Sequence, residues 1–143
     1  MKNRISIHDD WATPKEFYDK LNEEFHFDFD PCPLNHTFDG LNIDWGQSNF
    51  INPPYSRKLK EGFIRKAYEE SQKGKLCVML LPVSTSTKIF HEVILPNAEI
   101  RFIKGRIKFC SNGKDINKCG QMDSMIVIFR RMLAEATKEG GEK

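Results

Sequence analysis

The chain has 143 residues, 39% of them hydrophobic, so it is long enough for one domain with its own core and too short for two of ordinary size. No stretch approaches the roughly 18 apolar residues that span a bilayer, and the N-terminus lacks the apolar run of a signal peptide, which predicts a soluble, intracellular protein. The net charge of +2 hides a division: residues 1–44 carry ten acidic and four basic side chains, and residues 45–143 carry ten and eighteen. This division suggests two ligands of opposite charge, or solvated faces that merely differ.

The first predicted element is a helix over approximately 14–24. Thr13 is a candidate N-cap, Pro14 takes the first helical position, and Glu16 completes the pattern of a capping box. Apolar side chains then recur with helical spacing.

Aromatic and polar residues alternate from 25 to 30, which predicts a strand ending at Asp30. The following segment is rich in Asn, Asp and Gly and is expected to be mostly loop, with a possible short strand at Leu41–Ile43. A short apolar run then stops at the sequence Asn-Pro-Pro-Tyr, residues 52–55, and a helix follows from about residue 59. The predicted order is therefore strand, proline turn, helix.

Further elements follow in the second half of the chain. They are a buried strand at 76–81, a helix within 84–96, strands at 99–103 and 124–129, and a long basic loop at 105–122. Strands alternating with helices predict an α/β domain with a largely parallel sheet, in which ligands collect at the carboxyl ends of the strands. Three strand ends are thus candidate site positions: Asp30, Asn52 and Leu81.

Four cysteines occur without C-x-x-C spacing: Cys32, Cys77, Cys110 and Cys119. Cys77 lies in an apolar run, as is typical of a buried thiol. We predict reduced, structural cysteines rather than disulfides or zinc ligands, and no metal site.

The Asn52 turn has the chemistry to bind an aromatic amine. Two prolines fix two φ angles and remove two backbone donors, so rigid carbonyl acceptors remain. The Asn52 side-chain oxygen and the Pro53 carbonyl could accept both hydrogen atoms of one amino group, and Tyr55 could stack on its ring. The alternative is a proline turn that only closes a strand.

The motif resembles the N-P-P-Y form of the signature of S-adenosylmethionine-dependent amino-methyltransferases. Seven segments, "DWATPKEFYDKL", "FDFDPCPLN", "FDGLNIDW", "NFINPPYS", "LLPVSTSTKIFH", "EIRFIKGRIKF" and "SMIVIF", are similar in order and spacing to the phage-type DNA N-6-adenine methyltransferases, the Dam-like family of phages and prophages. The resemblance covers about residues 9–130. It implies an abbreviated Rossmann-like methyltransferase sheet with an antiparallel C-terminal strand, flanked by helices.

The resemblance implies roles for three groups of residues. The catalytic group is Asn52, Pro53, Pro54 and Tyr55. The group that binds S-adenosylmethionine is Trp11, Thr13, Pro14, Asp30, Pro31, Cys32, Asp39 and Asp44, with Asp30 favoured for the cationic amino-acid end and Asp39 and Asp44 unranked for the ribose or adenine. The nucleic-acid-binding group is Arg57, Lys58, Lys104, Arg106 and Lys108. Simpler readings stay open, since Thr13 could only cap a helix and Asp30 could only end a strand.

Two features depart from larger methyltransferases. Asp30 and Asn52 are 22 residues apart, too few for a complete βαβ crossover and its neighbours, and no Gly-rich loop follows the first strand. We expect residues 1–133 to form a single methyltransferase domain with a flexible tail at 134–143. The expected partner is DNA, double-stranded, methylated at short or relaxed sites by a monomer or homodimer in the cytoplasm of a bacterial host.

Two other functions fit the sequence. An amino-methyltransferase could act on cytosine, RNA adenine or protein glutamine, because the same motif serves all of these planar targets. A non-catalytic nucleic-acid-binding accessory protein is the other, although an intact Asn52–Tyr55 turn beside Asp30 argues against it.

Overall fold

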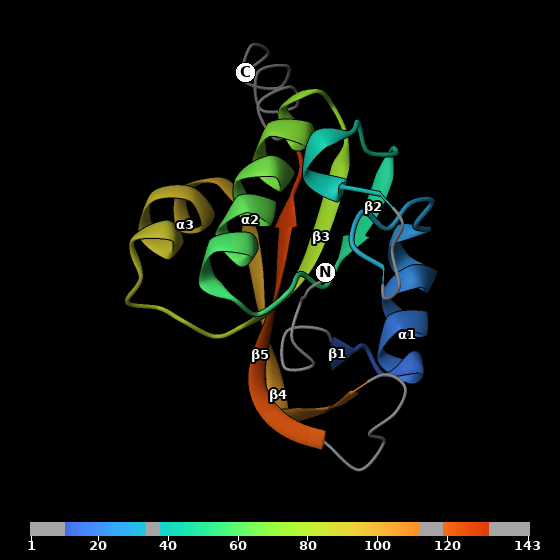
Figure 1. The fold of residues 1–143 in the computed structure, drawn as a ribbon, viewed down its shortest axis with the longest axis vertical. Coiled ribbons are helices and arrows are strands. Elements are labelled where there is room, and N and C mark those ends of the chain that lie inside the picture. Colours follow the sequence, from blue (N-terminus) through green and yellow to red (C-terminus); the bar gives the residue numbers. More distant parts are fainter. Residues whose placement is uncertain (1–10, 34–37, 112–118, 132–143) are drawn as a thin grey trace, which may run out of the picture.

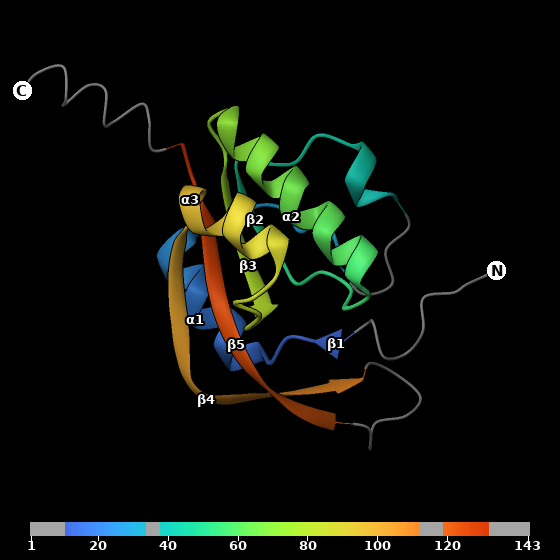
Figure 2. The ribbon, with the colours of Figure 1, turned by 90° about the vertical axis from the view of Figure 1, so that its left-hand side faces the viewer.

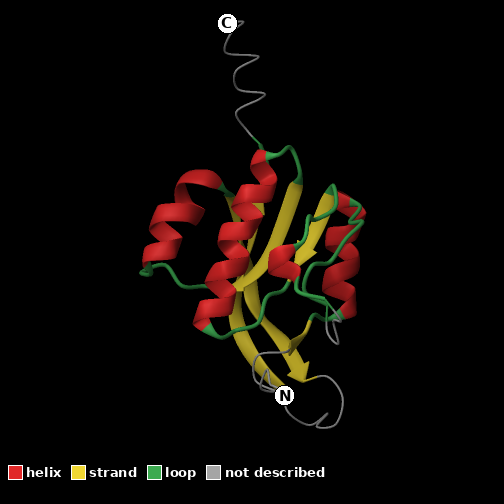
Figure 3. Ribbon diagram, turned by 45° about the horizontal axis from the view of Figure 1, so that its top comes forward, coloured by secondary structure: helices red, strands yellow, loops and turns green. Residues whose placement is uncertain are grey.

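A five-stranded sheet forms the centre of the protein in a computed structural model that describes residues 11–33, 38–111 and 119–131 (Figure 1). The spatial order is β1-β4-β5-β3-β2. The strands are β1 (Trp11–Ala12), β2 (Ser48–Ile51), β3 (Leu76–Pro82), β4 (Glu99–Ser111) and β5 (Cys119–Phe129). β4 and β5 curve and continue beyond the ends of β2 and β3 (Figures 1 and 3).

Helices cover both faces of the sheet. The helical segments are α1 (Lys15–Phe25), the 3-10 helix η1 (Gly40–Asn42), α2 (Arg57–Gln72), the π-helix η2 (Phe90–Ile94) and α3 (Leu95–Asn97). α1 lies on the opposite side of the sheet from α2 and α3 (Figure 2). This layered α/β arrangement confirms the predicted class.

The strand directions explain how the predicted parallel sheet is realised. β2 pairs parallel with β3, whereas β5 pairs antiparallel with both β3 and β4. β2, β3 and β4 therefore run the same way, and the C-terminal strand β5 runs against them. Because β5 inserts between β3 and β4, only one of the four pairings of named strands is parallel, so "largely parallel" was wrong for the pairings.

Alternating side chains of the central strands supply two cores. On one face Phe50, Val78 and Ile128 pack with Leu21 and Phe25 of α1. On the other face, the intervening strand residues pack against α2 and η2. The strand residues are Ile51, Cys77, Met79 and Val127, and the helix residues are Phe63, Ile64 and Ala67 of α2 and Phe90 of η2. The continuous apolar run at 76–81 is thus buried on both faces, as predicted.

The predicted N-terminal helix forms, but its cap differs. Pro14 is the N-cap of α1 and no side chain caps the helix. The Thr13 hydroxyl instead accepts a hydrogen bond from Asn52, so the expected capping box was wrong. At the other end His26 takes a left-handed conformation, with φ of 52°, and ends the helix.

Three further expectations need correction. The strand expected before Asp30 reduces to a single parallel bridge between Phe29 and Asn49, because α1 continues to Phe25. The short strand expected at Leu41–Ile43 is instead the 3-10 helix η1. The long basic loop expected at 105–122 is largely the paired ends of β4 and β5, since Ile107 and Phe109 alternate inward with polar neighbours facing out.

A buried carboxylate fixes the end of the sheet opposite the Asn52 turn. Glu70 is fully buried and accepts from the Lys75 ammonium at 2.6 Å, from the Lys73 ammonium at 2.8 Å and from the Trp45 backbone at 3.1 Å. Burial alone would raise the pKa of Glu70, but these bonds and Lys66 lower it to about 2. The network joins α2 to the loop before β2.

The sequence predictions on membrane spans, metal ligands and cysteines can be compared with the described residues. Within the described ranges, no helix is both long and apolar enough to cross a membrane, and no group of three or more His, Cys, Asp or Glu side chains could hold a metal ion. Neither Cys32 nor Cys77 is in a disulfide bond, and burial is the main cause that raises the pKa of Cys77 to about 12. The side chains of Cys110 and Cys119 and the expected tail at 134–143 lie outside the described residues.

Candidate functional site

The Asn52–Tyr55 turn lies at the carboxyl end of β2, between the strand and α2. Asn52 is half-buried and its Nδ2 donates to Thr13 Oγ1 at 2.8 Å, while its Oδ1 is shielded from solvent. Pro53 and Pro54 are buried. A residue 39 positions upstream therefore fixes the plane of the Asn52 amide, because β1 pairs with the far end of β4 and delivers Thr13 to the turn.

Tyr55 is held by the curved hairpin. Its ring meets the Phe109 ring edge to face, at 6.2 Å between centroids and 83° between planes. Burial raises the pKa of Tyr55 to about 12, so the phenol stays neutral at ordinary pH. The ring is thus a fixed, uncharged surface beside the turn.

Several residues expected to bind the cofactor meet in one small cavity of about 90 Å³. Pro31, Cys32 and Asp39 line it together with Pro54 of the turn. Gly40 allows this meeting, since a Cβ there would lie 2.0 Å from the Pro31 carbonyl oxygen. The close approach of two loops thus builds a pocket next to the turn.

Asp30 stabilises the loop that lines the small cavity. Its Oδ1 accepts from the Cys32 backbone at 2.8 Å, which fixes the loop that lines the small cavity. The pKa of Tyr18, on α1, is raised first by burial and then by the negative charge of Asp30. Asp39 has a second role, since it caps η1 by accepting from the Leu41 backbone.

Asp44 is separated from the other expected cofactor residues. Its exposed carboxylate pairs with Lys73 at 3.6 Å, just beyond the C-terminal end of α2. The Asn52 turn adjoins the opposite end of that helix. We therefore do not retain Asp44 in the proposed site. Trp11 belongs to β1, next to Thr13, and its side chain lies outside the described parts.

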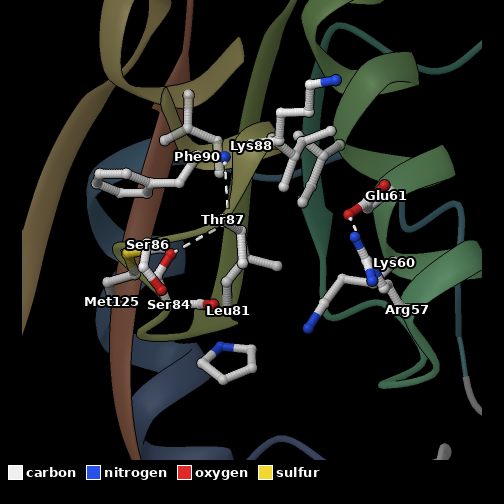
Figure 4. A pocket seen from close by; sticks show the side chains of 14 residues that line it. Arg57, Lys60, Glu61, Leu81, Ser84, Ser86, Thr87, Lys88, Phe90 and Met125 are labelled. Atoms are coloured by element: carbon white, nitrogen blue, oxygen red, sulfur yellow. Dashed lines mark hydrogen bonds and ion pairs between the residues drawn. The ribbon is translucent and has the colours of Figure 1, made fainter. Parts of the chain in front are cut away.

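A larger cavity of about 400 Å³ opens between α2 and the segment after β3. Arg57, Lys60 and Glu61 form its α2 wall, and Ser86 and Thr87 belong to the facing wall (Figure 4). The helix separates the two cavities, because Leu59 and Phe63 line the small one while residues 57, 60, 61 and 64 line the large one. Asp39 is the one charged residue among those that line the small cavity, whereas Arg57, Lys60, Lys88 and Glu61 line the large one.

The expected nucleic-acid-binding residues fall into two groups. Arg57 and Lys58 begin α2 directly after the turn, and both are exposed. Lys104, Arg106 and Lys108 are exposed on β4, near its bulge, where Arg106 pairs with Asp123 at 3.3 Å.

Three site features escaped sequence reasoning. Tyr18 was expected beside the apolar stripe of the first helix, and Phe109 was assigned to a loop. The Thr13–Asn52 bond joins positions 39 residues apart, which no local pattern reports. Only Phe109 had a usable signal, since polar and apolar residues alternate from Arg106 to Phe109.

The fold and site define an α/β protein with a candidate ligand site at the carboxyl edge of its sheet, formed by a proline turn that has a cavity on either side of the following helix. The chain belongs to the DNA N-6-adenine-methyltransferase (Dam) family, whose profile matches residues 2–139.

One curated relative is the DNA N-6-adenine-methyltransferase of Escherichia phage T1, which is 27% identical over 130 residues, covering 82% of this chain and 54% of the phage protein. The chain thus spans about half the length of that relative. No solved structure matches the chain.

Proposed function

We propose that this protein transfers a methyl group from S-adenosylmethionine to the exocyclic 6-amino group of adenine in DNA. The observation that carries the proposal is the Asn52–Tyr55 turn, with its amide plane fixed by Thr13, beside a small cavity lined by Asp39 and a larger cavity with a basic rim. Family membership supports the same activity. The sheet would then be an abbreviated Rossmann-like methyltransferase sheet formed by residues 1–133.

The turn can activate an amine without a strong base. Asn52 Oδ1 and the Pro53 carbonyl would each accept one hydrogen of the adenine amino group, which draws the nitrogen lone pair out of conjugation with the ring. Because Asn52 Nδ2 is bound to Thr13, Oδ1 is held in one orientation. Since Oδ1 is shielded from solvent, the groups that shield it would have to move before a base could reach it. Positioning and charge placement would supply most of the rate enhancement.

Tyr55 would stack on the adenine after the base has left the duplex. Its edge contact with Phe109 holds the ring still, so little order is lost when a base stacks on it. A phenol with a pKa of about 12 also brings no negative charge to the base.

The acidic side of the turn suits the cofactor. S-adenosylmethionine would supply the methyl group from its sulfonium centre. The small cavity encloses about 90 Å³, well below the roughly 300–1,000 Å³ of complete ligand sites, so Pro31, Cys32 and Pro54 would enclose one part of the cofactor. Asp39 at the rim suits ribose hydroxyls, and Asp30 suits the cationic amino-acid end. Thr13 and Pro14, with Trp11, would adjoin the methionine portion.

The basic side suits the DNA backbone. Arg57 and Lys58 adjoin the turn, and Lys104, Arg106 and Lys108 extend the cationic surface along β4. We propose double-stranded DNA as the substrate, short or relaxed sequence specificity, action as a monomer or homodimer, and a location in the host cytoplasm.

The test is to incubate the protein with labelled S-adenosylmethionine and, separately, with DNA, RNA or a protein mixture. The expected product is N6-methyladenine in DNA, identified by mass after digestion. Methylated cytosine, RNA adenine or glutamine would replace the proposal with another amino-methyltransferase activity, and cofactor binding without any methylated product would favour an accessory protein.

A further inference from the structure

The large cavity between α2 and the 84–94 segment has no role in the reaction as proposed. Its volume of about 400 Å³ falls in the range of sites for small organic molecules, roughly 300–1,000 Å³. The turn side chains that would hold the target adenine, Asn52 and Tyr55, do not line it. The cavity therefore has space for a ligand group beyond the target base.

Its floor and rim have different chemistry. The floor is apolar and is formed by six residues that all belong to the core: Ile64, Leu81, Ile89, Phe90, Ile94 and Met125. The rim carries three cations, Arg57, Lys60 and Lys88, against one acid, Glu61, which is paired with Arg57 at 3.3 Å. A ligand with a flat apolar part and an anionic part fits such a site.

Hydroxyl groups complete the wall that faces α2 (Figure 4). The Thr87 hydroxyl makes hydrogen bonds within its own segment: it donates to the Ser84 carbonyl oxygen and accepts from the Phe90 backbone N–H, each at 3.3 Å. These bonds fix the segment that begins η2. Ser86 is exposed and lines the cavity, so its hydroxyl can meet a polar ligand atom.

The cavity opens beside the catalytic turn. Arg57, which lines the cavity, follows Asn52 by five residues. Ile51, the residue before Asn52, pairs with Met79, and Leu81, which also lines the cavity, is two residues further along the paired strand β3. A group in the cavity would thus be next to an adenine bound at the turn. The closest candidate is the adjacent nucleotide of the same strand.

We propose that this cavity binds the nucleotide that immediately flanks the target adenine, with its base on the apolar floor and its phosphate at Lys60 and Lys88. The inference rests on the proposed function and deepens it, because it adds a second unstacked nucleotide to the substrate. Charge complementarity and the apolar floor favour a nucleotide over an uncharged or cationic ligand.

The test uses oligonucleotides with one target adenine and an abasic nucleotide directly 5′ or directly 3′ of it. Since stacking of one base contributes roughly a tenfold effect or more, wild-type kcat/KM should fall about tenfold for one of the two abasic substrates and little for the other. The intact oligonucleotide measures the proposed function separately.

Two variants link that penalty to the cavity. Ser86→Trp places a bulky ring in the opening from an exposed position, and Lys60→Gln with Lys88→Gln removes the phosphate partners. Both should methylate the intact oligonucleotide more slowly, and Ser86→Trp should abolish the difference between intact and abasic substrates. Arg65→Gln is the matched control, because Arg65 is exposed on α2 and does not line the cavity.

Each result decides the matter. Equal kcat/KM for the intact and both abasic substrates would overturn the inference while leaving the proposed function intact, as would an abasic penalty that persists in Ser86→Trp. If no substrate is methylated, binding of a dye-labelled single-stranded oligonucleotide, followed by anisotropy, replaces turnover. Weaker binding by Ser86→Trp and by the double lysine variant, but not by Arg65→Gln, supports the cavity, and unchanged binding rejects it.

Discussion

Replacing Thr13 by valine should slow methyl transfer without unfolding the protein. Valine keeps the shape of threonine and removes the oxygen that accepts from Asn52 Nδ2 at 2.8 Å. Because Asn52 is half-buried, an amide nitrogen left without that acceptor costs about 1–3 kcal/mol. That energy no longer favours the amide orientation that points Oδ1 at the substrate. Since 1.36 kcal/mol is a factor of ten in rate, kcat should fall about 10- to 100-fold.

Steady-state kinetics on a DNA substrate, with calorimetric titration of S-adenosylmethionine, measures this effect. Thr13→Ser keeps the hydroxyl and should retain most of kcat. Thr85→Val removes an exposed threonine hydroxyl elsewhere and should change nothing. Wild-type kcat in Thr13→Val, with only the cofactor affinity reduced, would refute the reasoning that Thr13 orients Asn52.

Three further predictions concern other parts of the structure. Glu70→Gln should reduce the free energy of unfolding by about 3 kcal/mol and lower Tm by about 10 °C, because the pKa of Glu70 in the folded protein is about 2, below the ordinary 4.5. This contribution is complete above pH 4.5 and is lost as pH falls toward 2. The stabilities of wild type and variant should therefore converge in acid unfolding experiments, and a constant difference would contradict the account. Asp123→Asn should tighten DNA binding a few-fold at low salt, because it releases Arg106 from its ion pair. Arg106→Gln should weaken DNA binding and reduce the slope of log affinity against log salt by about 1. Unchanged affinities and slopes in a filter-binding titration would show that Arg106 is not part of the interface. Tyr55→Phe should keep most of kcat and leave the pH–rate profile unchanged up to about pH 10, since the phenol of Tyr55 is neutral there. Tyr55→Ala should lower kcat roughly 10- to 100-fold, because the stacking ring is removed. Equal losses of kcat in both variants would mean that the hydroxyl, and not the ring, is required.

The sequence predicted the elements whose signals are local and strong. The apolar run at 76–81 became β3 because it is buried on both faces, and the stripe after the proline turn became α2. The strand, proline turn and helix around Asn52 follow the predicted order. These features depend on hydrophobic periodicity and on proline, both of which act over a few residues.

Other features depend on contacts between distant parts of the chain. Thr13 matched a helix cap, yet its hydroxyl accepts a hydrogen bond from Asn52. Glu70, which no sequence pattern marked, is surrounded by three lysines and the Trp45 backbone. The sequence did not firmly rank Asp39 and Asp44, and the fold separates them, with Asp39 at the small cavity and Asp44 at Lys73. Such assignments require the tertiary structure because each partner lies far away in sequence.

The central claim is that Asn52 activates an adenine amine in DNA, and Asn52→Ala tests it most directly. The measurement is single-turnover formation of N6-methyladenine in DNA, with S-adenosylmethionine affinity determined on the same preparation. The account predicts a loss of at least 100-fold in the methyl-transfer rate, since an interaction made in the transition state is removed, with cofactor affinity within a few-fold of wild type. Methyl transfer by Asn52→Ala at the wild-type rate would contradict it.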